Sequence, residues 1–261
     1  MSDPTVCAIM LTRDRPELAA RAVECFRKQT YADLQFFGLD TGEKCAKDTP
    51  YGEPLATTVW MPEQCGKRTI GELRNGAIKG ALGYFNFDIV VHWDDDDWSH
   101  PNRIVEQVEL LQSSAADVVG YRDMLFWREG VLEGEGRACS RPSEAWLYKH
   151  QTPARPYALG TSLCYWRKTW ERHHFANETQ GVEDHWLREK KVVSVSAMGP
   201  YGTALENRPA IYNNPETVRM IARIHGGNTS NGYKLEEYVA KGSKEWKRVP
   251  EWDQRVRELL G

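Results

Sequence analysis

Four consecutive aspartates, Asp94 to Asp97, are the residues of this sequence best suited to chemistry. They stand in VVHWDDDDWSHP, between strand-forming residues and a Ser-His-Pro segment that favours a helix start. Neighbouring carboxylates about 4 Å apart repel by roughly 1 kcal/mol in water and roughly 4 kcal/mol at an effective dielectric near 20. A bound cation removes that cost. Oxygen ligands without thiols favour Mg²⁺ or Mn²⁺, and Mg²⁺ is commonly shared between one or two carboxylates and substrate phosphates. The alternative is a solvated acidic loop.

Other residue types in the sequence suit the same kind of site. Glu183 and Asp184, in GVEDHWLREK, offer a carboxylate that can accept a proton, although acids in a first helical turn are also stabilised by the helix dipole. Arg74 suits phosphate geometry, or lies on a solvated helix face. His225 follows the apolar MIARI and enters a Gly-rich loop, where a neutral imidazole can bind a metal ion or serve the fold.

The whole chain sets outer limits. Its 261 residues suggest one large domain or a domain with an appendage, and 41% hydrophobic residues suffice for a core. The net charge of −3 gives no sign of nucleic acid or an anionic membrane as partner. No apolar run approaches the roughly 20 residues of a membrane span, and the start has no signal pattern. Six scattered cysteines without a CxxC pair argue against zinc and against a disulfide framework, so a cytoplasmic protein is expected.

Strand and helix patterns alternate in the first half of the chain. Helices are expected from Pro16, over 69–85 with Thr69 and Glu72 at capping-box spacing, and from Pro101 with Ser99 as N-cap. Strands are expected over 6–12, 34–40, 57–61 and 87–93. This alternation predicts an α/β fold, a mostly parallel sheet with helices on both faces. Beyond Val118 the pattern weakens, and we expect a strand pair or an insertion at 117–127 and 131–140. Strands are then expected at 157–166 and 192–198, with a short helix at 182–191 between them.

Several of these stretches resemble, in the same order, motifs of the family 2 glycosyltransferases with the GT-A fold. The resemblance runs from about Thr5 to Lys190. LTRDRPELAARAVECFRKQTY is similar to that family's first strand and helix, near the nucleotide base. Asp40 matches its base-contacting aspartate, and LRNGAIKGA its Ala-Arg-Asn-x-Gly helix. WDDDDWSHPNRI resembles its metal-binding aspartate signature, and GVEDHWLREK resembles its Glu-Asp motif.

The resemblance implies roles for individual residues. Asp96 would be the main metal ligand and Asp94 the second, for Mn²⁺ or Mg²⁺, with His225 as a further ligand from the C-terminal segment. Asp184 would be the general base, with Glu183 beside it, and the transfer would be inverting. Asp97 has no expected role beyond capping the following helix. The residues implied to bind the nucleotide sugar are Thr12, Arg13, Asp40, Arg74, Asn75, Asp94 and Asp95.

The resemblance also implies an organisation and an activity. A GT-A domain is expected over 1–205, and a small C-terminal extension over 206–261 that closes over the active site. The stretch LDTGEK departs from the family's two aspartates and Gly-Ser, which leaves the ribose contacts open. The Gln-x-x-Arg-Trp motif of processive synthases is missing from the sequence, which favours transfer of a single sugar.

The expected donor is a UDP- or GDP-sugar, and the acceptor hydroxyl belongs to a saccharide, a small molecule or a nucleic acid. Two alternatives remain on this fold: an enzyme that glycosylates a modified nucleic-acid base, and a non-catalytic protein that binds nucleotide sugar or carbohydrate. The segment 206–261 is barely basic, which gives the first little support. A nucleotidyltransferase is a third reading, but LTRDRPE stands where a Gly-rich phosphate loop would be expected.

Overall fold

The computed structural model describes residues 3–43, 58–62, 68–132, 139–152, 155–199, 217–225 and 235–261. The chain divides into two compact units, Met1–Tyr121 with Ala154–Ser194, and Arg122–Pro153 with Val195–Gly261. The expected domain boundary between 205 and 206 lies outside the described residues and stays a prediction. The same holds for segments 206–216 and 226–234 of the expected C-terminal extension. Within the described ranges, no helix combines the length and the apolar character that crossing a membrane requires.

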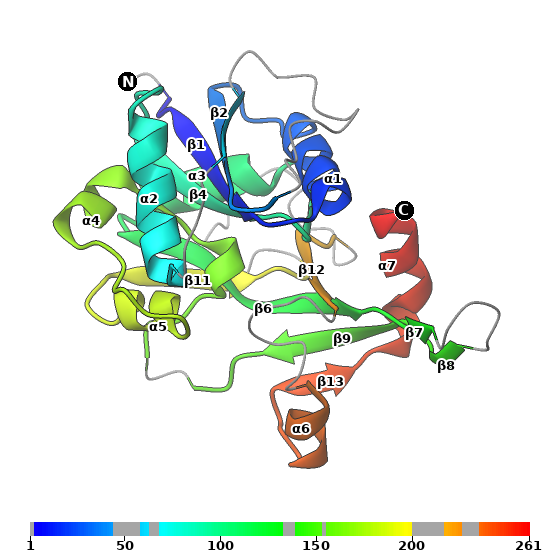
Figure 1. Ribbon diagram of the computed structural model, residues 1–261. Helices are drawn as coiled ribbons and strands as arrows, with labels where there is room; N and C mark the ends of the chain where they lie inside the picture. Colours follow the sequence, from blue (N-terminus) through cyan, green and yellow to red (C-terminus); the bar gives the residue numbers. More distant parts are fainter. Residues whose placement is uncertain are drawn as a thin grey trace. The chain divides into compact units, whose positions relative to one another are not determined.

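The first unit is built on an open, mostly parallel sheet (Figure 1). At its centre lies β1 (Val6–Thr12), parallel to β2 (Leu34–Asp40) on one side and to β4 (Ile89–Asp94) on the other. Beyond β2 comes β3 (Thr58–Pro62), also parallel, and beyond β4 comes β10 (Cys164–Trp166), which is antiparallel. The predicted mostly parallel α/β sheet is confirmed.

One face of this sheet carries an apolar cluster. Side chains alternate across a strand, so Cys7 and Ile9 of β1 share a face with Phe37 and Leu39 of β2. Against them pack buried side chains of three helices, α2 (Ile70–Leu82), α4 (Arg167–Arg172) and α5 (Val182–Leu187), through Ala77, Ile78, Ala81, Trp170, Val182, Trp186 and Leu187. The helix that carries Arg74 and the helix that carries Glu183 and Asp184 therefore rest on the same face.

The opposite face is covered by α1 (Pro16–Arg27) and α3 (Arg103–Ser113). Phe26 of α1 packs on Phe36, with ring centroids 5.0 Å apart, and on the edge of Trp93 at 5.8 Å. The Trp93 indole donates to the Ala22 carbonyl at 2.9 Å, and the Arg103 guanidinium of α3 lies 5.0 Å from the Trp93 ring centroid. The sheet thus has helices on both faces, as predicted.

The strand register brings the ends of three parallel strands to one edge. Thr12, the last residue of β1, lies opposite Asp40, the last residue of β2, and Leu11 lies opposite Asp94, the last residue of β4. The chain leaves β1 toward β2 on one side and returns to β4 on the other. In open α/β sheets ligands bind at such a change of direction, beyond the carboxyl ends of the strands.

The helix starts follow the sequence in two cases and differ in a third. Pro16 begins α1, and Thr69 caps α2 in a capping box whose two hydrogen bonds with Glu72 are both formed. The prediction that Ser99 caps a helix from Pro101 is wrong. α3 begins at Arg103, and Ser99 forms a short strand with Trp98, β5 (Trp98–Ser99), where its hydroxyl accepts from Arg103 Nη1 at 2.9 Å.

The strand expected over 157–166 is also mostly wrong. Only β10 (Cys164–Trp166) is a strand, and Gly160–Ser162 form one turn of 3-10 helix before it. The turn is closed by the Ser162 hydroxyl, which donates to the Leu159 carbonyl at 2.7 Å and accepts from the Tyr121 amide at 2.8 Å. These local hydrogen bonds compete with the extended conformation that the apolar residues favour.

In the second unit, the later part of β6 (Val118–Arg128) is antiparallel to β9 (Glu144–Lys149), which in turn is antiparallel to β13 (Trp246–Arg248). β12 (Met220–Ile224) runs parallel to β6. Aromatic side chains fill this sheet; the Trp246 ring lies 4.8 Å from Phe126 and 5.0 Å from Tyr148 between centroids. The remaining elements are β7 (Val131–Leu132), β8 (Cys139–Arg141), β11 (Val192–Ser196), α6 (Leu235–Ala240) and α7 (Asp253–Leu260).

Gly71 marks a very close approach between α2 and the segment that leads to α5. A Cβ at this position would lie 1.8 Å from the Ala176 carbonyl oxygen, which is backbone and cannot rotate away. We expect Gly71→Ala to lower the free energy of unfolding by about 1–3 kcal/mol, the usual cost of overpacking. Urea denaturation of the variant and the parent chain measures this difference.

Gly76, five residues further along the same helix, is the matched control. Its added Cβ would meet only the end of the Arg68 side chain, at 4.0 Å. Gly76→Ala is expected to leave stability unchanged or to raise it by up to about 1 kcal/mol, because alanine favours a helix interior. Equal effects of the two substitutions on the free energy of unfolding would show that the backbone at Ala176 moves to accommodate the added Cβ with little loss of stability.

Candidate active site

The four aspartates lie where the sequence predicts them, at and beyond the end of β4. Asp94 is the last residue of the strand, and the other three form the turn to β5. Asp95, Asp96 and Asp97 are buried, while the Asp94 side chain is about one third exposed. Thr12, at the end of β1, donates its hydroxyl hydrogen to Asp95 Oδ2 at 2.7 Å. The row is therefore part of the sheet edge and not a solvated loop.

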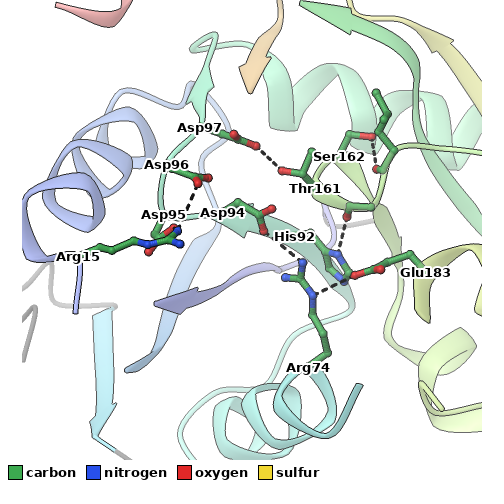
Figure 2. A network of polar contacts seen from close by, with 12 residues as sticks. Arg15, Arg74, His92, Asp94, Asp95, Asp96, Asp97, Thr161, Ser162 and Glu183 are labelled. Atoms are coloured by element: carbon green, nitrogen blue, oxygen red, sulfur yellow. Dashed lines mark hydrogen bonds and ion pairs between the residues drawn. The ribbon is translucent and has the colours of Figure 1, made fainter. Parts of the chain in front are cut away.

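Two arginines from the opposite faces of the sheet each bridge two carboxylates of this site (Figure 2). Arg15 Nη1 lies 3.2 Å from Asp95 Oδ1 and 3.3 Å from Asp96 Oδ2. Arg74 of α2 places Nη2 3.2 Å from Asp94 Oδ1 and Nε 3.4 Å from Glu183 Oε1. Five carboxyl groups, counting Asp97, thus surround these two guanidinium groups, which leaves the cluster negatively charged.

Arg74 is buried, with only 6% of its side chain exposed. Burial alone would lower the pKa of its guanidinium, but the carboxylates of Asp94 and Glu183 outweigh burial and raise the pKa, so the group stays charged. Its Nη1 is buried and has no hydrogen-bond partner among the described residues. A buried N–H without a partner is costly, and an oxygen of a bound anion would satisfy it.

Burial also shapes the charge of the aspartates. It raises the pKa of Asp95 to about 7, and the neighbouring Asp96 carboxylate adds to the rise, while Arg15 and the Thr12 hydroxyl oppose it. The pKa of Asp97 is raised well above its usual range, first by burial and then by Asp96 and Asp94, although the Thr161 hydroxyl donates to it. The turn therefore holds its negative charge at a cost that an added cation would reduce.

A buried histidine, His92, connects β4 to the 160–162 turn. Burial, helped by Arg74, lowers the pKa of His92 well below its usual range, so its imidazole is neutral. Its Nδ1 lies 2.7 Å from the Gly160 carbonyl, which can only accept, so Nδ1 carries the hydrogen and Nε2 accepts from the Tyr165 hydroxyl at 3.1 Å. A Cβ on Gly160 would lie 2.9 Å from Glu183 Cγ. The glycine thus leaves the room that Glu183 occupies beside Arg74.

Arg103 connects β4, which leads into the aspartate turn, to the same 160–162 turn. It is 1% exposed and donates from Nη2 to the carbonyls of His92 at 2.9 Å and Thr161 at 3.1 Å. Thr161 in turn donates its hydroxyl to Asp97. Asp97 therefore does not cap α3, the role that the sequence leaves for it; it is bound to the 160–162 turn. These contacts hold the aspartate row and Glu183 in a fixed relation to each other.

The structure separates the two acids of the Glu-Asp motif. Glu183 turns toward Arg74 and the aspartates, with 18% of its side chain exposed, whereas Asp184 is exposed on the first turn of α5. Asp40 is buried at the end of β2 and accepts from the Gly42 amide at 2.9 Å. Of the predicted site residues, the structure therefore brings together Thr12, Arg74, Asp94, Asp95, Asp96 and Glu183.

Two predicted residues of the first unit, Asn75 and Arg13, have other surroundings. Asn75 of α2 is engaged by the fold: its amide donates to the Phe175 carbonyl at 2.9 Å and accepts from the Trp170 indole at 2.9 Å. Arg13 is exposed, next to Asp14 at 3.8 Å. His225 follows β12 in the second unit, and its role as a ligand stays a prediction.

Arg15, which contacts two aspartates, was not singled out from the sequence. The available signals are its place in the Thr-x-x-Arg-Pro stretch of residues 12–16, which resembles a region near the nucleotide base, and its position immediately before Pro16, which starts α1.

The donor set fits a metal ion that is bound together with phosphates. The carboxylate oxygens of Asp94 and Asp96 are hard ligands of the kind that Mg²⁺ and Mn²⁺ take. Across the part of the chain that the structure describes, no three His, Cys, Asp or Glu side chains are grouped so as to hold a metal ion by themselves. One or two carboxylates suffice when a diphosphate supplies the other oxygens. The aspartates therefore suit a shared site and not a cage made by the protein alone.

Comparisons with known proteins show which solved structures share this fold. No protein-family model and no curated protein matches the sequence. Among solved structures, residues 1–349 of S. aureus TarS in complex with UDP match with a TM-score of 0.54 and 12% identity, over 84% of this chain and 60% of that chain. The mannosyltransferase PcManGT from Pyrobaculum calidifontis, in complex with GDP-Man and Mn²⁺, matches with a TM-score of 0.55 and 13% identity, over 100% of this chain and 69% of that chain.

These likenesses confirm the predicted fold. At identities of 12 to 14%, they show that the chain has the fold of glycosyltransferases of the GT-A type, and they show the fold alone. The chain spans about 60% of the length of the first TarS structures that it matches. The chemistry must therefore be argued from the site itself.

Proposed function

We propose that the chain is a glycosyltransferase that moves one sugar from a nucleoside-diphosphate sugar to an acceptor hydroxyl, with inversion at the sugar. One observation carries the proposal. In a glycosyltransferase fold, a row of buried carboxylates at the end of β4 lies beside a buried Arg74 that has an N–H without a partner among the described residues. This combination of negative charge for a cation and a donor for an anion suits a metal-bound diphosphate.

The donor would lie along the carboxyl ends of β1, β2 and β4. Thr12 and Asp40, opposite each other at two strand ends, are proposed to contact the nucleoside, with Arg13 at the rim. Arg74 Nη1 is proposed to donate to a phosphate oxygen. Asp95 is held by Thr12 and is proposed to face the ribose or the sugar. This order places the diphosphate over the aspartate turn.

Asp96 and Asp94 are proposed to hold Mn²⁺ or Mg²⁺, with Asp96 as the main ligand. When bound, the ion supplies positive charge to the departing nucleoside diphosphate. The chain's own part is to keep the two carboxylates in place: Asp94 through Arg74, and the turn through Arg103 and Thr161. A water-poor, pre-arranged site of this kind strengthens such charge interactions.

The acceptor is proposed to approach from the side of α5. Asp184 is exposed there and is proposed to take the proton of the attacking hydroxyl. Glu183, fixed by Arg74 and by the space above Gly160, is proposed to orient the acceptor or the sugar. A base on one side of the sugar and the leaving diphosphate on the other give a single displacement, which inverts the configuration.

A donor screen tests this proposal. UDP-, GDP- and TDP-sugars are incubated with the full chain and Mn²⁺, and release of the nucleoside diphosphate is followed over time. We expect slow hydrolysis of donors of one nucleotide class, since water can replace the missing acceptor, and loss of that release in EDTA. If no donor is hydrolysed and no UDP, GDP or TDP binds in calorimetry, the chain is not a nucleotide-sugar transferase.

A further inference from the structure

Arg15 pairs with Asp95 and with Asp96, the proposed main metal ligand. One nitrogen, Nη1, serves both carboxylates, at 3.2 Å from Asp95 and 3.3 Å from Asp96 (Figure 2). The two carboxyl groups are 5% and 9% exposed. Two adjacent buried carboxylates repel strongly unless a positive charge lies between them. Arg15 thus supplies a positive charge that stabilises this pair of carboxylates.

The backbone beneath Arg15 is anchored on both sides. Asp14 has a left-handed φ of 53°, and its side chain accepts from the Glu43 amide at 2.7 Å. A Cβ on Gly42 would lie 2.4 Å from the Asp14 nitrogen, so the two loops touch. Pro16 then begins α1. With the backbone held, the Arg15 guanidinium can leave the aspartates only by rotation of its side chain, which is 25% exposed and so has room toward solvent.

We propose that Arg15 is a resident counter-ion, which releases Asp96 to a divalent cation and passes to the diphosphate when the donor binds. The inference rests on the proposed function, because it needs a diphosphate and a cation at this turn. An arginine suits this exchange because its planar fork fits carboxylate and phosphate oxygens equally well. It gives Arg15, which lies in a stretch that resembles a region near the nucleotide base, a specific role in binding the diphosphate.

The exchange has a thermodynamic consequence. Without a diphosphate, a cation must displace Arg15 from Asp96 and leave the guanidinium in water. With a diphosphate present, Arg15 gains phosphate oxygens as it leaves, so cation and nucleotide bind more tightly together than apart. Such coupling is reciprocal: the nucleotide raises the affinity for the cation by the factor by which the cation raises the affinity for the nucleotide.

A permanent ion pair would behave differently. If Arg15 stayed on the aspartates throughout, its removal would raise the affinity for a cation by the same factor with and without nucleotide, because the local charge changes equally in both. If Arg15 passes to the diphosphate, removal strengthens cation binding only in the absence of nucleotide, and it weakens the combined binding. The ratio of the two cation affinities therefore separates the two roles.

The test is a Mn²⁺ titration of the full chain, with free Mn²⁺ followed by electron paramagnetic resonance and corrected for Mn²⁺ bound by nucleotide in solution. Parent chain and Arg15→Gln are compared without nucleotide and with saturating UDP or GDP in separate arms. In the parent chain, we expect nucleotide to tighten Mn²⁺ binding about tenfold or more. In Arg15→Gln, we expect Mn²⁺ alone to bind several-fold more tightly than in the parent chain, and the nucleotide to add about threefold or less.

Arg21→Gln is the matched control, since Arg21 is exposed on α1 and its loss changes the net charge equally. It is expected to behave as the parent chain. Arg15→Lys, which keeps the charge without the fork, serves if Arg15→Gln does not fold by circular dichroism. In Arg15→Lys, Mn²⁺ alone should bind as weakly as it does to the parent chain. Nucleotide should tighten Mn²⁺ binding by a smaller factor than in the parent chain.

Three results would overturn the inference. An unchanged enhancement by nucleotide in Arg15→Gln, or in Arg15→Lys where the glutamine variant does not fold, would make Arg15 a permanent ion pair. If Mn²⁺ alone binds no more tightly to Arg15→Gln than to the parent chain, Arg15 does not compete with the cation, and the inference is wrong. If the parent chain binds no Mn²⁺ even with UDP or GDP, the metal site of the proposed function is wrong and the inference falls with it. Nucleotide binding in calorimetry then shows whether the donor site remains.

Discussion

Asp184→Asn is expected to lower turnover by about 10²–10⁴-fold, the usual contribution of a general base, while the affinity for the donor stays nearly unchanged. The amide keeps the shape of the side chain and cannot accept the proton of the attacking hydroxyl. Asp184 is exposed on α5, and the ion pairs of Arg15 and Arg74 with the aspartates do not include it, so its loss should leave those pairs in place. Release of the nucleoside diphosphate measures turnover, and calorimetry with UDP or GDP measures donor binding.

Glu189→Gln is the matched control for this substitution. Glu189 lies five residues further along the same segment, with 80% of its side chain exposed, and its change removes the same charge. It should leave turnover within about twofold of the parent chain, because exposed charges contribute little. A large loss in Glu183→Gln together with near-normal turnover in Asp184→Asn would make Glu183 the base. Loss of donor binding in Asp184→Asn would move Asp184 to the nucleotide site.

Asp96→Asn is expected to weaken Mn²⁺-dependent binding of UDP or GDP by tenfold or more, which corresponds to about 1.4 kcal/mol or more. The substitution removes the charge of the proposed main ligand and keeps its size in a site that is 9% exposed. In EDTA, the parent chain should bind nucleotide as weakly as the variant does, because both then lack the cation. Calorimetric titrations with and without Mn²⁺ give the four affinities.

Asp88→Asn provides the comparison at the other end of the same strand. Asp88 is exposed just before β4 and accepts from the Thr5 amide at 3.1 Å, a contact that an asparagine oxygen can keep. Its nucleotide affinity should equal that of the parent chain with Mn²⁺ and fall equally in EDTA. Nucleotide affinity that is the same in all four titrations of parent chain and Asp96→Asn would show that binding needs no cation at this turn.

The sheet was predictable because its strands are buried on both faces and bounded by clear signals. VCAIMLT and LQFFGLD are short apolar runs, and the structure has β1 and β2 with those bounds. The capping box of Thr69 and Glu72 fixed the start of α2. The prediction failed at 157–166, where the Ser162 hydroxyl binds the backbone and replaces strand pairing by a turn.

The site was predictable in its carboxylates and less so in its arginines. Four adjacent aspartates stand out because charge of one sign is concentrated without a partner nearby in the sequence. Their partners come from distant segments, Arg15 across 80 residues and Arg74 across 20, and only the folded register brings them together. Arg13 and Arg15 are equally basic on paper. In the fold Arg15 faces the aspartates and Arg13 is exposed, with the left-handed Asp14 between them.

The contact of α2 with the segment before α5 has a practical consequence for protein engineering. Gly71 and Asn75, one helical turn apart, hold residues 175–178 by hydrogen bonds. The Gly71 amide donates to the Glu178 carbonyl at 3.3 Å, and the Asn75 side chain donates to the Phe175 carbonyl and accepts from the Phe175 amide. Thr179 and Gln180, immediately after these hydrogen-bonded residues, are exposed. A library meant to change acceptor choice should vary or lengthen the chain at 179–180, because insertions within 175–178 would carry the whole of α5 out of place.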